Sequence, residues 1–333
     1  MISDLFKEFE DFYVSDYNFE FNLLRIQDGL LDLKASLIDN WSPIRSDASI
    51  KRFKNLIRRI GPKASFSNFE SLFYSNGMNY DYFFNNKFSQ ISEEYINSLI
   101  DYRYVGEWPY SSINQSPFDQ LFSRIRNNFG LKNDRKERVN VSSAKDFTKI
   151  TKNYLEKLFS EYGNKSCKNI VINNAFEPFN PEASIQLFNN AKSIVVKRDP
   201  RDIYCSTINT LTHKTFIPSY DNNDYHKDLK KDFLNTKNIE NFILRQKIYF
   251  EKTNNKSEQN VLRLNFEDIV LDYENQLQII YDFLKIDGSS HINKNKFFKP
   301  KLSANNIGLW KHNNQSNEIK LISKELKDYL YHH

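Results

Sequence analysis

Along the first half of the chain, apolar and polar residues alternate with the period of an α-helix. Between residues 47 and 60, apolar side chains recur every three or four positions, and Gly61 and Pro62 end the pattern. The segment 92–104 also fits a helix, in a region rich in Phe and Tyr. The mixed charge run KNDRKERVN at 132–140 has no apolar period and predicts a solvated loop. We therefore expect this half to be mainly helical.

The second half of the chain alternates short apolar runs with longer amphipathic stretches. The runs at 168–173, 192–197 and 261–266 predict short buried strands. Strands separated by helices of this length are typical of a parallel sheet that is covered by helices on both faces. We therefore predict a three-layer α/β fold. The helices are expected near 181–190, from Pro200, and over 239–252, 273–286 and 319–331.

The length of 333 residues is enough to bury a large core, and it allows one large domain or two. We expect a single domain over residues 1–333. Within it, residues of about 60–150 form a helical, aromatic-rich insertion, and residues 168–330 form the α/β part.

The net charge, the cysteines and the histidines argue against several functional classes of protein. There are 47 Lys and Arg against 42 Asp and Glu, and the formal charge of +5 suits an anionic ligand but not a nucleic-acid-binding protein. Cys167 and Cys205 do not make a disulfide framework, and the six histidines lack the spacing of a metal site. The acidic start resembles no signal peptide, and no apolar run approaches the roughly 18 residues of a membrane helix. These features predict a cytoplasmic protein without a transmembrane segment or a metal.

Glycine is scarce, with 8 residues in 333 against a usual share of about 7%. Tight loops that bind phosphate groups through backbone N–H groups depend on glycine. The composition therefore argues against a dinucleotide-binding protein or a P-loop NTPase.

The string SIVVKRDPRDIYCS, which ends at Ser206, is the most informative stretch of the chain. Arg198 follows the predicted strand, at the carboxyl edge where open α/β sheets bind ligands. Asp199 can cap the next helix, Asp202 lies in its first turn, and Ser206 lies one turn further on the same face. A helix amino terminus beside a guanidinium attracts anions, so these residues predict a phosphate site. They also fit an ordinary strand–turn–helix in which Arg198 pairs with Asp199 or Asp202.

Three segments, taken in order, resemble the sulfotransferases that use 3′-phosphoadenosine-5′-phosphosulfate. KRDPRDIYCS resembles their 3′-phosphate-binding signature, in which a Ser lies eight residues after an Arg, as Ser206 does after Arg198. VLRLNFEDIVLDYENQLQIIYDFLKI is similar to the strand, the Glu-Asp-Leu segment and the helix that follow in the family. FFKPKLSANNIGLWK, at 297–311, resembles the carboxyl-terminal cofactor loop, which ends in Gly-x-Trp-Lys.

The resemblance implies a fold related to P-loop nucleoside kinases and a sulfotransferase of the bacterial, carbohydrate-modifying type. Such an enzyme moves a sulfuryl group to a hydroxyl or amine of a carbohydrate, for example a cell-surface polysaccharide or a glycolipid. The product nucleotide is adenosine 3′,5′-bisphosphate. Arg198 and Ser206 would hold the 3′-phosphate, the insertion would face the acceptor, and no metal is required.

The carboxyl-terminal loop departs from the family pattern. Cytosolic eukaryotic members carry Arg-Lys-Gly where this chain has Ser303, Ala304 and Asn305. The resemblance therefore implies that Ser303 and Asn305 donate hydrogen bonds to the nucleotide. It also implies that Lys301, or Lys299, supplies the missing charge.

The amino-terminal region departs further, because the family's 5′-phosphosulfate loop has no counterpart. Arg45 and Ser46 match the start of such a loop, but Asp47 stands where its glycine belongs, and we interpret this stretch as a helix cap. The family's first strand and its loop are expected to be absent. Two alternatives follow: a catalytically impaired or truncated homologue, or a non-catalytic protein that binds an acidic glycan or a nucleotide.

The general base of the family is a His or Glu that follows the strand before the phosphate signature. The usual His position falls on Phe176, and the adjacent Glu177 is the candidate that the resemblance implies. Glu107 is a second candidate. Glu177 also fits an ordinary solvated loop residue.

Overall fold

The computed structural model describes residues 2–15, 19–65, 75, 77–107, 121, 125, 136–163, 167–210, 238–253, 259–313 and 316–332. The chain divides into two compact units. Unit 1 comprises Met1–Glu20, Ser166–Ile185 and Asn190–His333, and unit 2 comprises Phe21–Lys165 and Gln186–Asn189.

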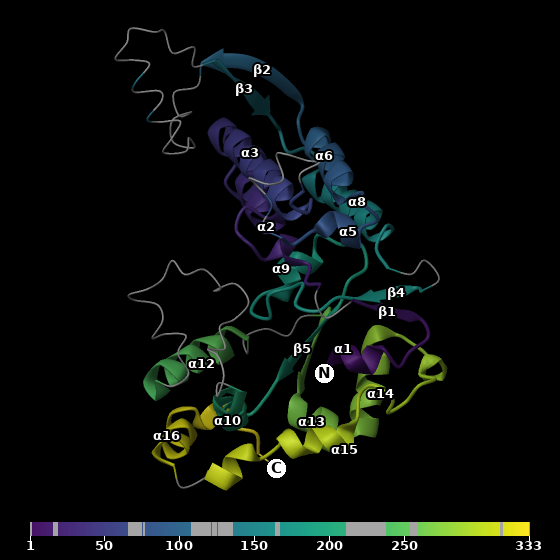
Figure 1. The fold of residues 1–333 in the computed structure, drawn as a ribbon, viewed down its shortest axis with the longest axis vertical. Coiled ribbons are helices and arrows are strands. Elements are labelled where there is room, and N and C mark those ends of the chain that lie inside the picture. Colours follow the sequence, from purple (N-terminus) through teal and green to yellow (C-terminus); the bar gives the residue numbers. More distant parts are fainter. Residues whose placement is uncertain are drawn as a thin grey trace. The chain divides into compact units, whose positions relative to one another are not determined.

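Unit 1 is a mixed α/β unit with two parallel strand pairs (Figure 1). β1 (Phe12–Val14) pairs with β4 (Asn169–Val171), and β5 (Ser193–Lys197) pairs with β6 (Val261–Asn265). The predicted strands at 192–197 and 261–266 are confirmed, as is the α/β class. The helices are α1 (Ile2–Phe6), α9 (Pro181–Ile185), α10 (Pro200–Thr210), α12 (Ile239–Thr253), α13 (Phe266–Leu271), α14 (Tyr273–Leu284), α15 (Pro300–Ser303) and α16 (Asn317–Glu325).

The amino-terminal strand pair differs from the prediction. The sequence predicts no strand at this end, but β1 lies parallel to β4, with Phe12 opposite Asn169 and Val14 opposite Val171. A strand of three residues is too short to show a period of two. The predicted burial of the strand at 168–173 is also wrong, because Ile170 is 37% exposed. Side chains alternate between the faces of a strand, and one face of β4 is exposed.

In its described residues, unit 2 is mainly helical and contains one antiparallel strand pair. β2 (Tyr102–Glu107) pairs with β3 (Lys136–Val141). The predicted helix at 92–104 is wrong beyond residue 98, because Tyr-Arg-Tyr-Val at the start of β2 combines aromatic and β-branched residues that favour strands. The charge run at 132–140 is predicted to be a loop, but its residues 136–140 belong to β3, and 132–135 lie outside the described residues. The helices are α2 (Leu30–Lys34), α3 (Pro43–Ile60), α5 (Tyr80–Phe83), α6 (Phe88–Ser98) and α8 (Phe147–Phe159), with a π-helical turn at Ala35–Asp39.

The start of α3 explains the acidic residue at position 47. Ser42 caps the helix, since its side chain accepts the backbone N–H of Arg45 at 3.1 Å. Asp47 is buried and accepts the backbone N–H of Asn140 at 2.8 Å, and its other oxygen pairs with Lys51 at 2.8 Å. Asp47 therefore joins α3 to β3.

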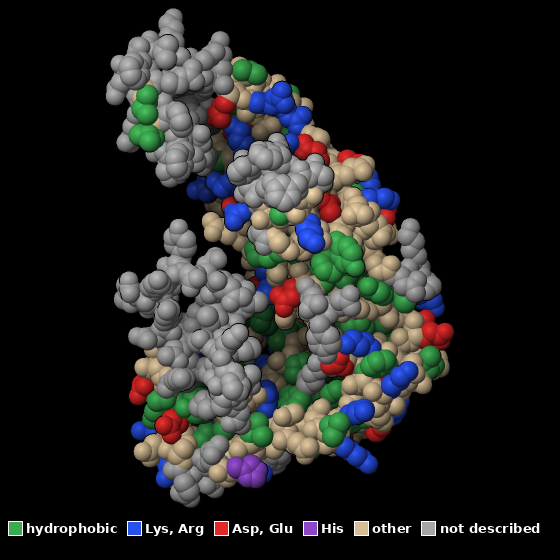
Figure 2. Space-filling view, viewed as in Figure 1, with side chains coloured by type: hydrophobic (Ala, Val, Ile, Leu, Met, Phe, Trp, Pro, Cys, Tyr) green, Lys and Arg blue, Asp and Glu red, His purple; other side chains and the backbone are tan. Residues whose placement is uncertain are grey.

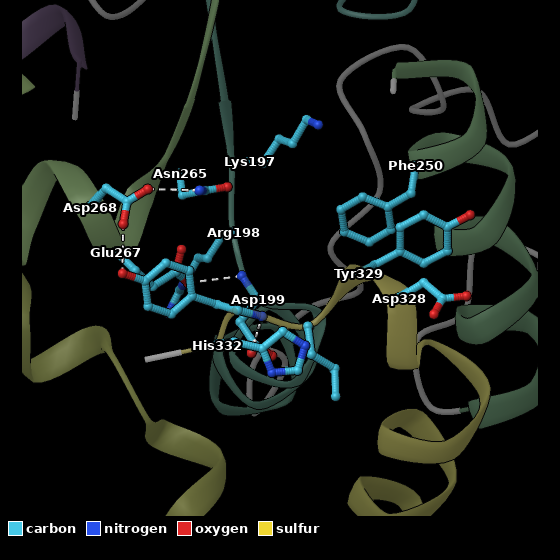
Figure 3. A pocket seen from close by; sticks show the side chains of 12 residues that line it. Lys197, Arg198, Asp199, Phe250, Asn265, Glu267, Asp268, Asp328, Tyr329 and His332 are labelled. Carbon is cyan, nitrogen blue, oxygen red and sulfur yellow. Dashed lines mark hydrogen bonds between the residues drawn. The ribbon is translucent and has the colours of Figure 1, made fainter. Parts of the chain in front are cut away.

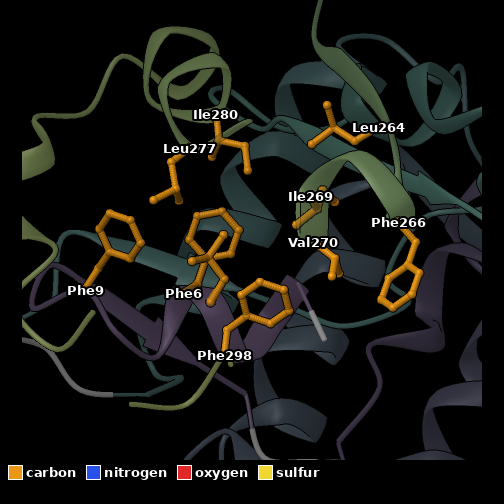
Figure 4. Packing of buried hydrophobic residues seen from close by; sticks show 10 residues of the cluster. Phe6, Phe9, Leu264, Phe266, Ile269, Val270, Leu277, Ile280 and Phe298 are labelled. Carbon is orange, nitrogen blue, oxygen red and sulfur yellow. The ribbon is translucent and has the colours of Figure 1, made fainter. Parts of the chain in front are cut away.

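A hydrophobic core of unit 1 combines residues of the amino-terminal segment with residues between 264 and 298 (Figure 4). Phe6 and Phe9, from the amino-terminal segment, share this cluster with Leu277 and Ile280 of α14 and with Phe298. Burial of apolar surface is the main favourable term in folding. The amino-terminal residues are therefore part of the same folding unit as residues 264–298.

Surface charge is mixed on the face that Figure 2 shows, where basic and acidic side chains are interspersed. The formal charge of +5 is therefore not gathered into one basic stripe on this face. Within the described ranges, none of the helices is long and apolar enough to cross a membrane.

Ile280→Ala is expected to lower the free energy of unfolding by about 2–5 kcal/mol, because the substitution leaves a cavity in a packed core. Ile280 is 0% exposed, whereas its neighbour Ile279 on the same helix is 42% exposed. Ile279→Ala is the matched control and should cost less than about 1 kcal/mol. Urea denaturation of the three proteins measures the difference. Equal losses from the two variants would contradict the burial of this face of α14.

Candidate functional site

The site lies where two parallel strands of unit 1 end side by side. Lys197, the last residue of β5, is opposite Asn265, the last residue of β6. Arg198 follows β5 directly, and α13 begins with Phe266 and Glu267 directly after β6. The carboxyl ends of parallel strands meet at one edge of a sheet, and the register therefore brings Arg198 to the start of α13.

Arg198 is half-buried and holds the carboxyl-terminal loop. Its Nη2 donates to the backbone carbonyl of Asn306 at 2.6 Å, and its guanidinium lies 5.1 Å from the centre of the Phe266 ring. Its Nε is buried and has no hydrogen-bond partner among the described residues. An arginine has five N–H donors, so this contact leaves donor capacity for an anion.

Asp202, in the first turn of α10, binds the same loop. Its side chain is 1% exposed and accepts the backbone N–H of Gly308 at 2.8 Å and that of Trp310 at 3.3 Å. Gly308 has φ +75°, a conformation that glycine adopts without strain. The sequence places Asp202 at the helix start, and the structure adds contacts to a loop about a hundred residues away.

Asp199 directly precedes α10 and binds Arg201. One oxygen of Asp199 accepts the backbone N–H of Arg201 at 2.8 Å, and the side chains pair at 3.0 and 2.6 Å. The Arg201 guanidinium lies 3.9 Å from the centre of the Trp310 ring, a cation–π contact. In the described part of the chain, neither Asp199 nor Asp202 pairs with Arg198. The alternative in which Arg198 forms such a pair is therefore wrong.

Glu267 connects the two strand ends. Its Oε1 accepts the backbone N–H of Asp199 at 2.8 Å, and its Oε2 is buried without a hydrogen-bond partner among the described residues. Burial raises the pKa of Glu267 above its usual range, and the nearby charges of Asp199 and Asp202 raise it further. A proton on this carboxyl group reduces the repulsion among the three acids.

A pocket of about 370 Å³ opens at this edge (Figure 3). Its wall includes Lys197 and Arg198 from the β5 end, Asn265 and Glu267 from the β6 end, and residues of the carboxyl-terminal segment. Burial lowers the pKa of Lys197, and the charge of Arg263 lowers it further. The full lining is Lys197, Arg198, Asp199, Phe250, Asn265, Glu267, Asp268, Asp328, Tyr329, Leu330, Tyr331 and His332.

The carboxyl-terminal segment is attached to the pocket by two hydrogen bonds of Tyr331. Its backbone N–H donates to Asp199 at 3.1 Å, and its hydroxyl donates to Asp268 at 2.6 Å. The bond to Asp268 and burial raise the pKa of Tyr331 to about 12. Tyr329 stacks on Phe250 of α12, with ring centres 4.8 Å apart (Figure 3). No sequence signal singled out Tyr331 or Lys197.

The other predicted nucleotide-binding residues do not line the pocket. Ser206 is half-buried on α10, one turn after Asp202. Lys301 is exposed and Ser303 half-buried on α15. Asn305 is exposed in the 3-10 turn η5 (Ala304–Asn306) that follows. Their contacts with a nucleotide stay predictions.

The predicted base lies elsewhere in unit 1. Glu177 is half-buried in the loop between β4 and α9, and it does not line the pocket of Arg198. Glu107 ends β2 in unit 2, and its side chain is outside the described residues. Within the described ranges, no group of three His, Cys, Asp or Glu side chains could hold a metal ion.

Comparison with known proteins gives one match. A family model described as "Sulfotransferase family" matches residues 115–290, which is more than half of the 333-residue chain. The matched range contains β4, Glu177, the turn at Arg198 and the β6–α13–α14 segment. No curated protein and no solved structure matches the chain.

The raised pKa of Glu267 predicts a pH-dependent stability. The folded protein binds this proton more tightly than the unfolded chain, so ionising Glu267 costs stability as the pH rises above its usual pKa of 4.5. Glu267→Gln keeps an oxygen for the Asp199 N–H and removes the titration. The stability of the variant relative to the natural protein is expected to increase as the pH rises from 4.5 towards neutral and above.

Thermal unfolding across this pH range measures the effect. Glu274→Gln is the control, because Glu274 is exposed on α14. Parallel pH profiles for Glu267→Gln and the natural protein would show that burial does not raise this pKa.

Proposed function

Because the chain belongs to the sulfotransferase family, we propose that it moves a sulfuryl group from 3′-phosphoadenosine-5′-phosphosulfate to a hydroxyl or amine of a carbohydrate. The acceptor is a cell-surface polysaccharide or a glycolipid. The observation that carries the proposal is the position of Arg198, which follows β5 directly and lies at the amino terminus of α10. This position combines a guanidinium with a helix dipole, the arrangement that phosphate groups favour.

The 3′-phosphate is assigned to Arg198 and Ser206. The buried Nε of Arg198 has no partner among the described residues, and a phosphate oxygen would satisfy it. Lys301, Ser303 and Asn305 precede Asn306 in the chain by one to five residues, and Arg198 already binds the carbonyl of Asn306. Lys301 would supply a cation, and Ser303 and Asn305 would supply neutral hydrogen-bond donors, to another part of the same nucleotide. The proposal also includes the three-layer fold of the family, in which helices cover both faces of the parallel sheet that ends at this edge.

The nucleotide supplies the sulfuryl group, and the protein supplies positioning and a base. In the proposed step, the acceptor oxygen or nitrogen bonds to sulfur as the bond from sulfur to the 5′-phosphate oxygen breaks. Glu177 takes the acceptor proton, and adenosine 3′,5′-bisphosphate leaves. By analogy with phosphoryl transfer, most of the rate enhancement then comes from orientation and charge stabilisation.

Arg198→Ala is expected to weaken binding of adenosine 3′,5′-bisphosphate about tenfold or more, because a charge-assisted hydrogen bond is lost. Adenosine 5′-monophosphate lacks the 3′-phosphate, so its affinity should change little. Lys168→Ala is the control, since this lysine is 79% exposed. Isothermal titration calorimetry measures all three proteins. An equal loss for both nucleotides would contradict the assignment of the 3′-phosphate.

Glu177→Gln tests the base. We expect kcat for sulfate transfer to fall about 10²–10⁴-fold, with nucleotide affinity unchanged, because a base acts only on the acceptor proton. Glu240→Gln, on the exposed side of α12, is the control. Transfer of radiolabelled sulfate to a panel of oligosaccharides measures activity. Unchanged kcat in Glu177→Gln would remove Glu177 from the mechanism, and nucleotide binding without any transfer by the natural protein would favour the non-catalytic alternative.

A further inference from the structure

We infer that Glu8, near the amino terminus, is a positioning residue of the nucleotide site. It fixes one end of the carboxyl-terminal loop while Asp202 fixes the other. The inference rests on the proposed function, and the loop's attachment can also be tested without it. The loop concerned runs from residue 295 to residue 310 and contains Lys301, Ser303 and Asn305.

Glu8 is a buried carboxylate with every acceptor position in use. Its side chain is 0% exposed. One oxygen accepts the backbone N–H groups of Phe297 and Phe298 at 2.8 and 2.7 Å. The other accepts the backbone N–H of Asn295 at 3.0 Å and bonds to Nε2 of His291 at 2.8 Å. A carboxylate has about four acceptor sites, so this arrangement saturates it.

His291 is held in place by its own neighbours. Its Nδ1 lies 2.7 Å from the hydroxyl of Tyr281 on α14, and its ring stacks on Phe9 with centres 4.2 Å apart. The two ring nitrogens of His291 therefore connect Glu8 to Tyr281. The anchor is therefore a buried hydrogen-bond network that is also packed by an aromatic ring.

The nucleotide-binding part of the loop is held between this anchor and Asp202. Glu8 binds the backbone up to Phe298, and Asp202 binds it again from Gly308. The segment between the anchors carries the three predicted nucleotide donors, and the contact of Arg198 with Asn306 lies inside it. With both ends fixed, the segment loses little conformational entropy when it closes on a ligand.

Glu8→Gln changes the network without changing its shape. A glutamine amide places an NH₂ group where one carboxylate oxygen stood, and this group faces N–H donors instead of accepting from them. Glu10→Gln is the matched control: it is the same chemical change two residues away, at an exposed position. Asp202→Asn makes the corresponding change at the other anchor.

Hydrogen exchange followed by mass spectrometry tests the anchor directly. We expect the amides of 295–298 to exchange at least tenfold faster in Glu8→Gln than in the natural protein, and those of 308–310 to do so in Asp202→Asn. The α3 amides of unit 2, and the loop of Glu10→Gln, should keep the natural rates. Natural rates at 295–298 in a folded Glu8→Gln protein would overturn the inference. If that variant does not fold, natural rates at 308–310 in Asp202→Asn would do so.

Binding separates positioning from general stability. Glu8→Gln and Asp202→Asn should each weaken adenosine 3′,5′-bisphosphate at least fivefold, and Glu10→Gln should leave the affinities for this nucleotide and for adenosine 5′-monophosphate within twofold. Titration at a temperature at which each variant is fully folded excludes a loss of general stability as the cause. Faster loop exchange with unchanged affinity for the bisphosphate would overturn the positioning role. Failure of the natural protein to bind either nucleotide would refute the proposed function, while the exchange rates would still decide whether Glu8 anchors the loop.

Discussion

Buried carboxylates that accept backbone N–H groups hold the site of unit 1 together. Asp199, Asp202, Glu267 and Glu8 are nearly inaccessible to water, and each accepts at least one N–H from another segment. A buried charge is costly unless hydrogen bonds compensate it. Here the compensation comes from loops, so the charges determine where those loops lie. The loop at 295–310 and the segment around Tyr331 therefore depend on charge–dipole contacts as much as on apolar packing.

The same buried carboxyl groups also affect how an anion can bind in the pocket. The pocket wall combines Lys197 and Arg198 with the carboxyl groups of Asp199, Glu267 and Asp268. The Arg201 side chain neutralises Asp199, and the raised pKa of Glu267 favours its protonated form. Acidic side chains at this edge therefore repel an anion less than their number suggests. The positive charges of Lys197 and Arg198 can therefore attract a phosphate group at this edge.

Helices and strands with a clear period of apolar residues were predictable from the sequence, but contacts between segments far apart in the chain were not. The run SIVVK and the Asp-Pro that follows it identified β5 and the start of α10. Asp202 looked like an ordinary first-turn acid, because its partners lie 106 and 108 residues away. β1 is too short to show a period. For Glu8 there was a signal: its spacing from Leu5 places it on the apolar side of a helical turn, where a carboxylate needs a partner.

The contacts of Glu8 have a consequence for synthesis on the ribosome. They span 283 to 290 residues of sequence, so the amino-terminal segment has to wait for most of the chain before its buried carboxylate is satisfied. Until then, Phe6 and Phe9 also lack the partners they contact in α14 and at Phe298. Contacts of such long range are typical of late folding events. The contacts of Glu8 thus form only after translation has passed residue 298, and until then the nascent chain exposes the apolar side chains of Phe6 and Phe9, which chaperones can bind.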